Sequence, residues 1–147
     1  MRRIARWTAA CTAGLLVMWI AMAVQPAVAQ VPRDALLQFE GNVKWAAVSS
    51  DWAGQRDGWI AAVKSARSPA DVAAQLLVLE TAMRWRSVED SWRERRDSWV
   101  AEMQAARTSA AVAHGLLELE NATKWSAVEP AWHDLRDDWV ARLNSVQ

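Results

Sequence analysis

Residues 68–107 have the sequence SPADVAAQLLVLETAMRWRSVEDSWRERRDSWVAEMQAAR, and they contain the signals of a pair of helices. The segment Ser68-Pro69-Ala70-Asp71 has a hydroxyl N-cap, a proline at the first helical position and an acid at the third, which is typical of a helix start. Apolar residues then recur at the spacing of one buried helical stripe, namely Val72, Leu76, Leu79 and Met83.

A second stripe follows, but it is out of phase with the first by about two residues. Its members are Trp85, Val88, Trp92, Arg95 or Arg96, and Trp99. A phase jump of this kind indicates a bend, so we predict a short turn near residues 85–89 and two antiparallel helices. The alternative is one long helix per segment, as in a spectrin-like bundle.

The same pattern occurs three times without a gap, in residues 28–67, 68–107 and 108–147. Pro130 in the third copy lies just after the phase jump, where proline is tolerated as the first residue of a new helix. Ten positions are identical in all three copies, and in the middle copy they are Leu76, Leu77, Glu80, Trp85, Val88, Trp92, Arg96, Asp97, Trp99 and Ala101. We therefore predict an all-α fold of three helical hairpins, forming either a short α-solenoid or a closed six-helix bundle.

Residues 1–29 have the features of a signal peptide. A basic start leads into an apolar run, and Ala27-Val28-Ala29 supplies the small residues that a signal peptidase recognises. We predict cleavage before Gln30, which gives a mature chain with repeats at 30–67, 68–107 and 108–147. The alternative is an uncleaved anchor, because the apolar run approaches the roughly 20 residues that span a bilayer. We expect a periplasmic or secreted protein with no stable membrane insertion after cleavage.

The composition of the mature chain argues against several classes of function. The full chain has 17 basic and 17 acidic residues, and the signal segment holds three of the basic ones, so the mature charge is 14 − 17 = −3. A nucleic-acid partner is therefore not expected. The single cysteine, Cys11, leaves with the signal, so the mature chain has neither disulfides nor a cysteine nucleophile.

The candidate site is a strip of nine tryptophans and three arginines from the identical positions. Its members are Trp45, Trp52, Trp59, Trp85, Trp92, Trp99, Trp125, Trp132, Trp139, Arg56, Arg96 and Arg136. Tryptophans at seven-residue spacing predict a packed core, and the alternative is an exposed aromatic strip that binds a glycan or a small cationic ligand.

The sequence also predicts the surroundings of the three repeated arginines. Arg96 lies four residues after Trp92 and three before Trp99, so we expect its stem to lie between the two indoles and its charge to require a carboxylate. The nearest repeated acid is Glu80. Local i, i+4 pairs compete for that acid, and they are Glu40–Lys44, Glu80–Arg84 and Glu120–Lys124.

Catalytic chemistry has little support in the residues. The two histidines, His114 and His133, fall at different repeat positions, and the sequence has no glycine-rich phosphate loop and no serine elbow. We predict that the protein is not an enzyme and needs no cofactor or metal.

The stretch from Trp99 to Val128 contains a tryptophan, the segment 106–113, and then Leu116, Leu119-Glu120 and Trp125. This arrangement resembles the WHIM motif of chromatin-remodelling partner proteins, in which a leucine-rich helix ending in Leu-Glu precedes a tryptophan. The resemblance implies a helical packing element, which in that family is associated with linker-DNA sensing. From it we take the helical geometry.

For function we expect a non-enzymatic interaction or scaffold module whose partner is another envelope protein, and the alternative is a binder of a small molecule or glycan.

Overall fold

The computed structural model describes residues 25–147, with side chains from Ala29 onward. The described chain is all-α, as predicted. Its helices are α1 (Gln25–Asn42), α2 (Trp52–Ser65), α3 (Pro69–Ala82), α4 (Trp92–Ala105), α5 (Ser109–Ala122) and α6 (Trp132–Asn144). Three short 3₁₀ helices lie in the turns of the hairpins, and they are η1 (Trp45–Ala47), η2 (Trp85–Ser87) and η3 (Trp125–Ala127).

The local signals explain where the helices begin. The hydroxyl of Ser68 accepts from the backbone N–H of Asp71, and the carboxylate of Asp71 accepts from the N–H of Ser68, which completes the capping box. The hydroxyl of Thr108 caps α5 by accepting from the backbone N–H of Ala111. The second helix of each hairpin begins later than we predicted, since α6 starts at Trp132 and Pro130 lies in the turn before it.

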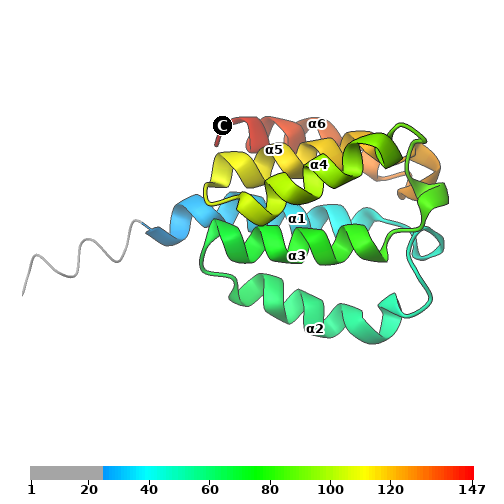
Figure 1. Cartoon of the computed structure of the whole chain (residues 1–147), viewed down its shortest axis with the longest axis horizontal. Helices are drawn as coiled ribbons and strands as arrows, with labels where there is room; N and C mark the ends of the chain where they lie inside the picture. The colour runs from blue at the N-terminus through cyan, green and yellow to red at the C-terminus, as the bar shows by residue number, and fades with distance from the viewer. Residues whose placement is uncertain (1–24) are drawn as a thin grey trace, which may run out of the picture.

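The hairpins are arranged as an inner and an outer layer. The first helices, α1, α3 and α5, all contact one another in the middle of the molecule. Each second helix packs on its own partner and on the first helix of the next hairpin, so α2 contacts α3 and α4 contacts α5. Helix α6 completes the cycle by packing on α1. The three turns gather at one end of the bundle, on the right in Figure 1.

Backbone hydrogen bonds at this end close the three hairpins into a ring. The amide N–H of Arg84 donates to the Ala47 carbonyl at 2.8 Å, and that of Lys124 donates to Ser87 at 2.9 Å. The amide of Lys44 makes the equivalent bond to Ala127, across 83 positions of the sequence, at 2.9 Å. Isolated β-bridges follow the same order and pair Val48 with Met83, Val88 with Thr123, and Val128 with Val43.

Indole hydrogen bonds close the ring a second time, near the middle of the helices. The Nε1–H of Trp59 donates to the Gln75 carbonyl, and that of Trp99 donates to Gly115, each at 2.9 Å. Trp139 makes the same bond, also at 2.9 Å, to the Ala35 carbonyl of the first hairpin. The third hairpin therefore meets the first through the interface that joins the others, and the fold is a closed six-helix bundle rather than an open solenoid.

The core lies between the two layers and around the central axis. All four members of the first predicted stripe, Val72, Leu76, Leu79 and Met83, are buried. Phe39 from α1 is fully buried and contacts Trp132 and Trp139 of the last hairpin at centroid distances of 5.7 and 5.9 Å. The single phenylalanine thus lies at the junction that closes the bundle.

The predicted signal peptide falls mostly outside the described residues. Only its last part, from Gln25, is described, and it is helical and continuous with the rest of α1. Ala29, the last residue before the predicted cleavage site, is buried. Within residues 25–147, no helix combines the length and the apolar character needed to cross a membrane.

Ring closure predicts that the chain tolerates circular permutation at a repeat boundary. A permutant of residues 28–147 that joins Gln147 to Val28 and begins at Ser68 should unfold within about 5 °C of the parent protein, because it keeps all three interfaces. Thermal unfolding followed by circular dichroism measures this.

A second permutant, opened between Leu76 and Leu77 inside α3, is the control and should not fold, because both residues lie within a helix that packs on the core. If the first permutant also fails to fold, the third hairpin does not meet the first as described.

Candidate functional site

The nine tryptophans fall into two environments. Trp52, Trp92 and Trp132, together with Trp59, Trp99 and Trp139, are buried with at most 4% of their surface exposed. The remaining set is half exposed, since Trp45, Trp85 and Trp125 are 60, 48 and 51% accessible. The predicted core stripe is therefore wrong for one position in each repeat, because Trp85 is half exposed and starts the 3₁₀ helix η2 within the predicted turn.

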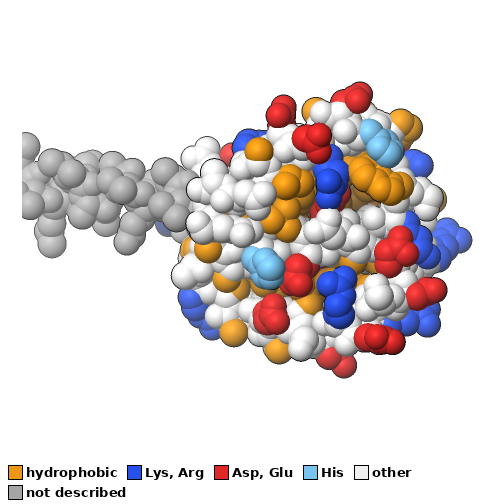
Figure 2. Space-filling model, turned by 90° about the horizontal axis from the view of Figure 1, so that it is seen from above, with side chains coloured by type: hydrophobic (Ala, Val, Ile, Leu, Met, Phe, Trp, Pro, Cys, Tyr) orange, Lys and Arg blue, Asp and Glu red, His pale blue; other side chains and the backbone are white. Residues whose placement is uncertain are grey.

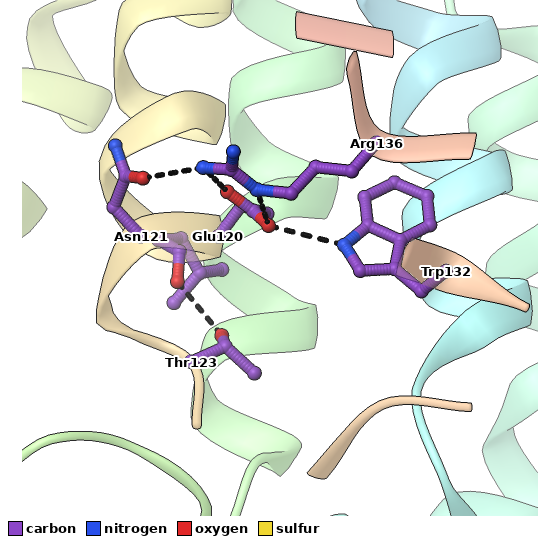
Figure 3. A network of polar contacts seen from close by, with 6 residues as sticks. Glu120, Asn121, Thr123, Trp132 and Arg136 are labelled. Atoms are coloured by element: carbon purple, nitrogen blue, oxygen red, sulfur yellow. Dashed lines mark hydrogen bonds and ion pairs between the residues drawn. The ribbon is translucent and has the colours of Figure 1, made fainter. Parts of the chain in front are cut away.

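A buried glutamate joins the two helices of each hairpin. Glu120 is 5% exposed, and its Oε1 accepts from the indole N–H of Trp132 at 3.0 Å. Arg136 donates from Nε to the same oxygen at 2.7 Å and from Nη2 to Oε2 at 3.0 Å, as Figure 3 shows. The carboxylate comes from α5, whereas the indole and the guanidinium come from α6.

The same network occurs in the other two repeats with almost the same dimensions. In the second repeat Trp92 and Arg96 bind Glu80, with an Nε to Oε1 distance of 2.6 Å for the arginine. In the first repeat Trp52 and Arg56 bind Glu40, again at 2.6 Å. The arginine and the glutamate at the repeated positions thus form a bidentate ion pair across each hairpin.

The geometry of the ion pair and a third hydrogen-bond donor stabilise it. A bidentate arginine matches the geometry of a carboxylate, and the indole N–H provides a third donor to the buried oxygens. The hydrogen bonds that Arg96 donates to Glu80 raise the pKa of Arg96, against the lowering effect of partial burial. Loss of the arginine would leave a buried carboxylate with one donor, which is costly. The predicted local pairs with Lys44, Arg84 and Lys124 are not among the ion pairs of residues 25–147, because each glutamate is turned inward.

Each exposed indole lies against the paired arginine of its own repeat. The guanidinium carbon is 5.7 Å from the ring centroid for Arg56 over Trp45, 5.8 Å for Arg96 over Trp85 and 5.7 Å for Arg136 over Trp125. This corrects the predicted sandwich between Trp92 and Trp99. The arginine stacks instead on the tryptophan of the turn, which precedes it by 11 residues.

Two of the three exposed indoles have a second planar neighbour. Arg93 lies over the Trp85 ring at 5.3 Å, and His133 stacks on Trp125 with a centroid distance of 4.1 Å and an angle of 13° between the planes. Both residues hold the same repeat position, and the first repeat has Ala53 there. No equivalent second contact to Trp45 occurs among the described residues.

Small hollows lie beside two of the exposed indoles. One of about 130 Å³ is lined by Trp45, Gly41, Glu40 and Arg56, and another of about 250 Å³ by Trp85, Thr81, Glu80 and Arg96. Each hollow combines an indole with a guanidinium whose charge is balanced by the carboxylate. The residues at these sites suit stacking and hydrogen bonding.

The histidines do not form a site together. His133 stacks on Trp125, whereas the Nε2 of His114 lies 3.7 Å from Oε2 of Glu118 on α5. Within residues 25–147 no group of three or more histidine, cysteine, aspartate and glutamate side chains is placed to hold a metal ion.

Sequence reasoning identified the tryptophan and arginine positions, but it missed the planar neighbours Arg93 and His133 and the carbonyl acceptors of the buried indoles. The sequence also indicated Glu80 as the nearest repeated acid to Arg96, with Arg84 as a competing partner, and in the structure Glu80 pairs with Arg96. A carbonyl acceptor such as Gly115 leaves no signal, because every residue has the same backbone group.

Comparison with known proteins gives one match. Residues 26–88 match the model of a domain of unknown function, DUF8799. The matched segment spans the first hairpin, α3 and η2, which is less than half of the chain, and it ends at the turn of the second hairpin. No curated protein and no solved structure matches the chain.

The two environments predict opposite results for tryptophan substitutions in the central repeat. Trp92→Ala should lower the free energy of unfolding by about 3 to 5 kcal/mol, because it removes a large buried ring. Trp85→Ala should cost about 1 kcal/mol or less, since it removes only an exposed stacking contact. Urea unfolding measures both values. A loss of 3 kcal/mol or more in Trp85→Ala would show that the turn tryptophan is part of the core.

Proposed function

We propose that this protein is an exported, non-enzymatic interaction module, and that the exposed tryptophans of its turns form the surface that meets a protein partner. The observation that supports this proposal is that Trp45, Trp85 and Trp125 are repeated without change although half of each ring faces solvent. Burial explains the other six repeated tryptophans. Exposed tryptophan is enriched at the energetic centres of protein interfaces, because its large rigid ring loses little entropy on binding.

The arrangement of the three indoles supports a surface that acts as a unit. Each begins a 3₁₀ helix of the turns that are hydrogen-bonded into a ring at one end of the bundle. The paired arginines lie beside them and are only partly exposed, with their charges balanced by buried carboxylates. Tryptophan and arginine are both enriched in interface hot spots.

The surrounding surface favours a protein partner over a polyanion. Basic and acidic side chains are interspersed on the face shown in Figure 2, without a broad area of one sign. Binding to a nucleic acid relies on clustered positive charge that neutralises phosphates.

Export is the second part of the proposal, and the repeat register supports it. Ala29 is the equivalent of Pro69 and Ser109, which are the first residues of α3 and α5. Cleavage before Gln30 would therefore leave the first helix starting near its repeat position. Pro32 would then lie in the first turn, where its missing N–H removes no hydrogen bond from the helix.

This register predicts the N-terminus of the mature protein. Intact-mass analysis of the protein purified from its native host should give a chain that begins at Gln30, with the glutamine cyclised or free. The export proposal fails if the recovered protein retains Met1.

The interaction surface can be tested by substitution with a matched control. Wild-type residues 30–147, immobilised and exposed to a native envelope extract, should retain a defined protein partner. The triple variant Trp45→Ser, Trp85→Ser, Trp125→Ser should lose it, because it removes the three exposed rings while the core stays intact.

The control is the double variant Val78→Ser, Leu135→Ser, which removes two other exposed hydrophobic side chains, 41 and 40% accessible, that lie on helices α3 and α6. It should retain the partner as the wild type does. Equal retention by the triple variant, in a protein whose circular dichroism spectrum is unchanged, would contradict the proposed surface.

The second candidate function is binding of a small molecule or glycan. The hollows beside Trp45 and Trp85 favour it, because sugar rings stack on indole faces and hydrogen-bond to neighbouring arginines. A soluble oligosaccharide that displaces the protein partner, or that binds where no protein does, would favour this candidate.

A further inference from the structure

The three repeats allow an internal comparison at the exposed tryptophans. In each repeat the turn and the second helix begin at the same offsets, with η1, η2 and η3 starting 40 residues apart and α2, α4 and α6 likewise. The residue one position after the buried tryptophan that starts each second helix is Ala53, Arg93 or His133. Arg93 and His133 each contact the exposed indole of their own repeat, and both present a planar nitrogen-containing group.

The first repeat lacks this planar group. Ala53 is too short to reach Trp45, and Trp45 is accordingly the most exposed of the three indoles, at 60%. Gly41 stands where the other repeats have Thr81 and Asn121, and a Cβ built on it meets nothing within 4 Å. The part of the Trp45 ring that an arginine or a histidine covers elsewhere is therefore open, beside the hollow of about 130 Å³.

The arginine contacts of the first two repeats indicate what this opening can accept. Among residues 25–147, Arg56 is the cation that lies over the Trp45 ring, and both oxygens of Glu40 hold it. The second repeat shows that such a pair tolerates another guanidinium, because Arg93 and the paired Arg96 both lie over Trp85.

We propose that Trp45 is a binding site for the guanidinium of an arginine side chain supplied by the protein partner. The incoming arginine takes the place that Arg93 occupies in the second repeat and stacks on the open part of the indole. This inference rests on the proposed interaction function and specifies the chemistry of one of its three contact points. Trp85 and Trp125 are already covered in part by the chain's own residues, so the three repeats are not equivalent toward a partner.

The experiment follows the indole N–H signals of the mature protein by ¹⁵N-edited NMR during titration with acetyl-arginine-methylamide. The Trp45 signal should move in a saturable manner, and the signals of Trp85 and Trp125 should move much less. The same titration with acetyl-norleucine-methylamide, which keeps the aliphatic chain and lacks the guanidinium, should leave Trp45 nearly unchanged. Equal movement with both compounds would overturn the guanidinium assignment.

Substitutions at the compared position provide the decisive controls. Ala53→Arg should reduce the response of Trp45 by about two- to fivefold, because the new side chain covers the ring from within the chain. Arg93→Ala and His133→Ala should have the reverse effect and make Trp85 and Trp125 respond to the arginine compound. If Trp45 responds equally in the wild type and in Ala53→Arg, the open face is not the site.

The outcome separates this inference from the proposed function. A partner captured through the exposed tryptophans by the parent protein and equally well by Ala53→Arg would leave the interaction surface in place and overturn the arginine site. Loss of capture in Ala53→Arg, with capture retained in Ala53→Ser, would support both. A saturable Trp45 response without any captured partner would support the site and overturn the interaction function.

Discussion

Each hairpin depends on one buried glutamate that binds across to the second helix. Glu40, Glu80 and Glu120 are each nearly inaccessible to solvent, and each receives three hydrogen bonds from a tryptophan and an arginine that lie 12 and 16 residues later. A buried carboxylate without partners is costly, so the two helices are held at the separation and angle that satisfy it. Because the network fixes the second helix, it also fixes the turn and the exposed indole that lies over the arginine.

Ring closure follows from the same three units. A hairpin of 40 residues is too small to bury its apolar faces alone, so it needs neighbours on both sides. In an open array the end hairpins would each leave one face uncovered. Here the third hairpin meets the first through the same indole-to-carbonyl bond and the same backbone bonds as the other pairs, so all three interfaces are used. Repeated sequence and closed geometry together remove the need for special capping units.

The packing of the hairpins decides which of the repeated tryptophans are exposed. The sequence predicts the same burial for Trp85 and Trp92, since both are identical in all three repeats and lie seven residues apart. In the fold one is enclosed and bonded to a carboxylate, and the other lies half in solvent over an arginine whose charge is already balanced. The differences among the repeats then become informative. Arg93 covers part of the exposed ring in the second repeat and His133 does so in the third, whereas the first repeat has Ala53 at this position.

Sequence alone determined the helical class, the three-fold repetition, the position of the turns to within a few residues and the buried stripe that includes Leu76 and Leu79. These features depend on contacts between residues close in the chain, such as the capping box at Ser68 and the spacing of apolar side chains on one helix. The predicted burial of the second stripe was wrong at Trp85, which lies half exposed in the turn seven residues before the second helix begins.

Only the tertiary structure decided that the bundle closes, that Glu80 turns inward to Arg96 rather than along its helix to Arg84, and that three of the nine repeated tryptophans are exposed. Each of these outcomes depends on the relative placement of separate helices. Local spacing is the same whether a glutamate faces solvent or a neighbouring helix, and the carbonyl that accepts an indole hydrogen bond is chemically identical to every other in the chain. The physical reason is that the burial of a side chain and its choice of hydrogen-bond partner depend on how the hairpins pack against one another. The periodicity of a single hairpin carries no information about that packing.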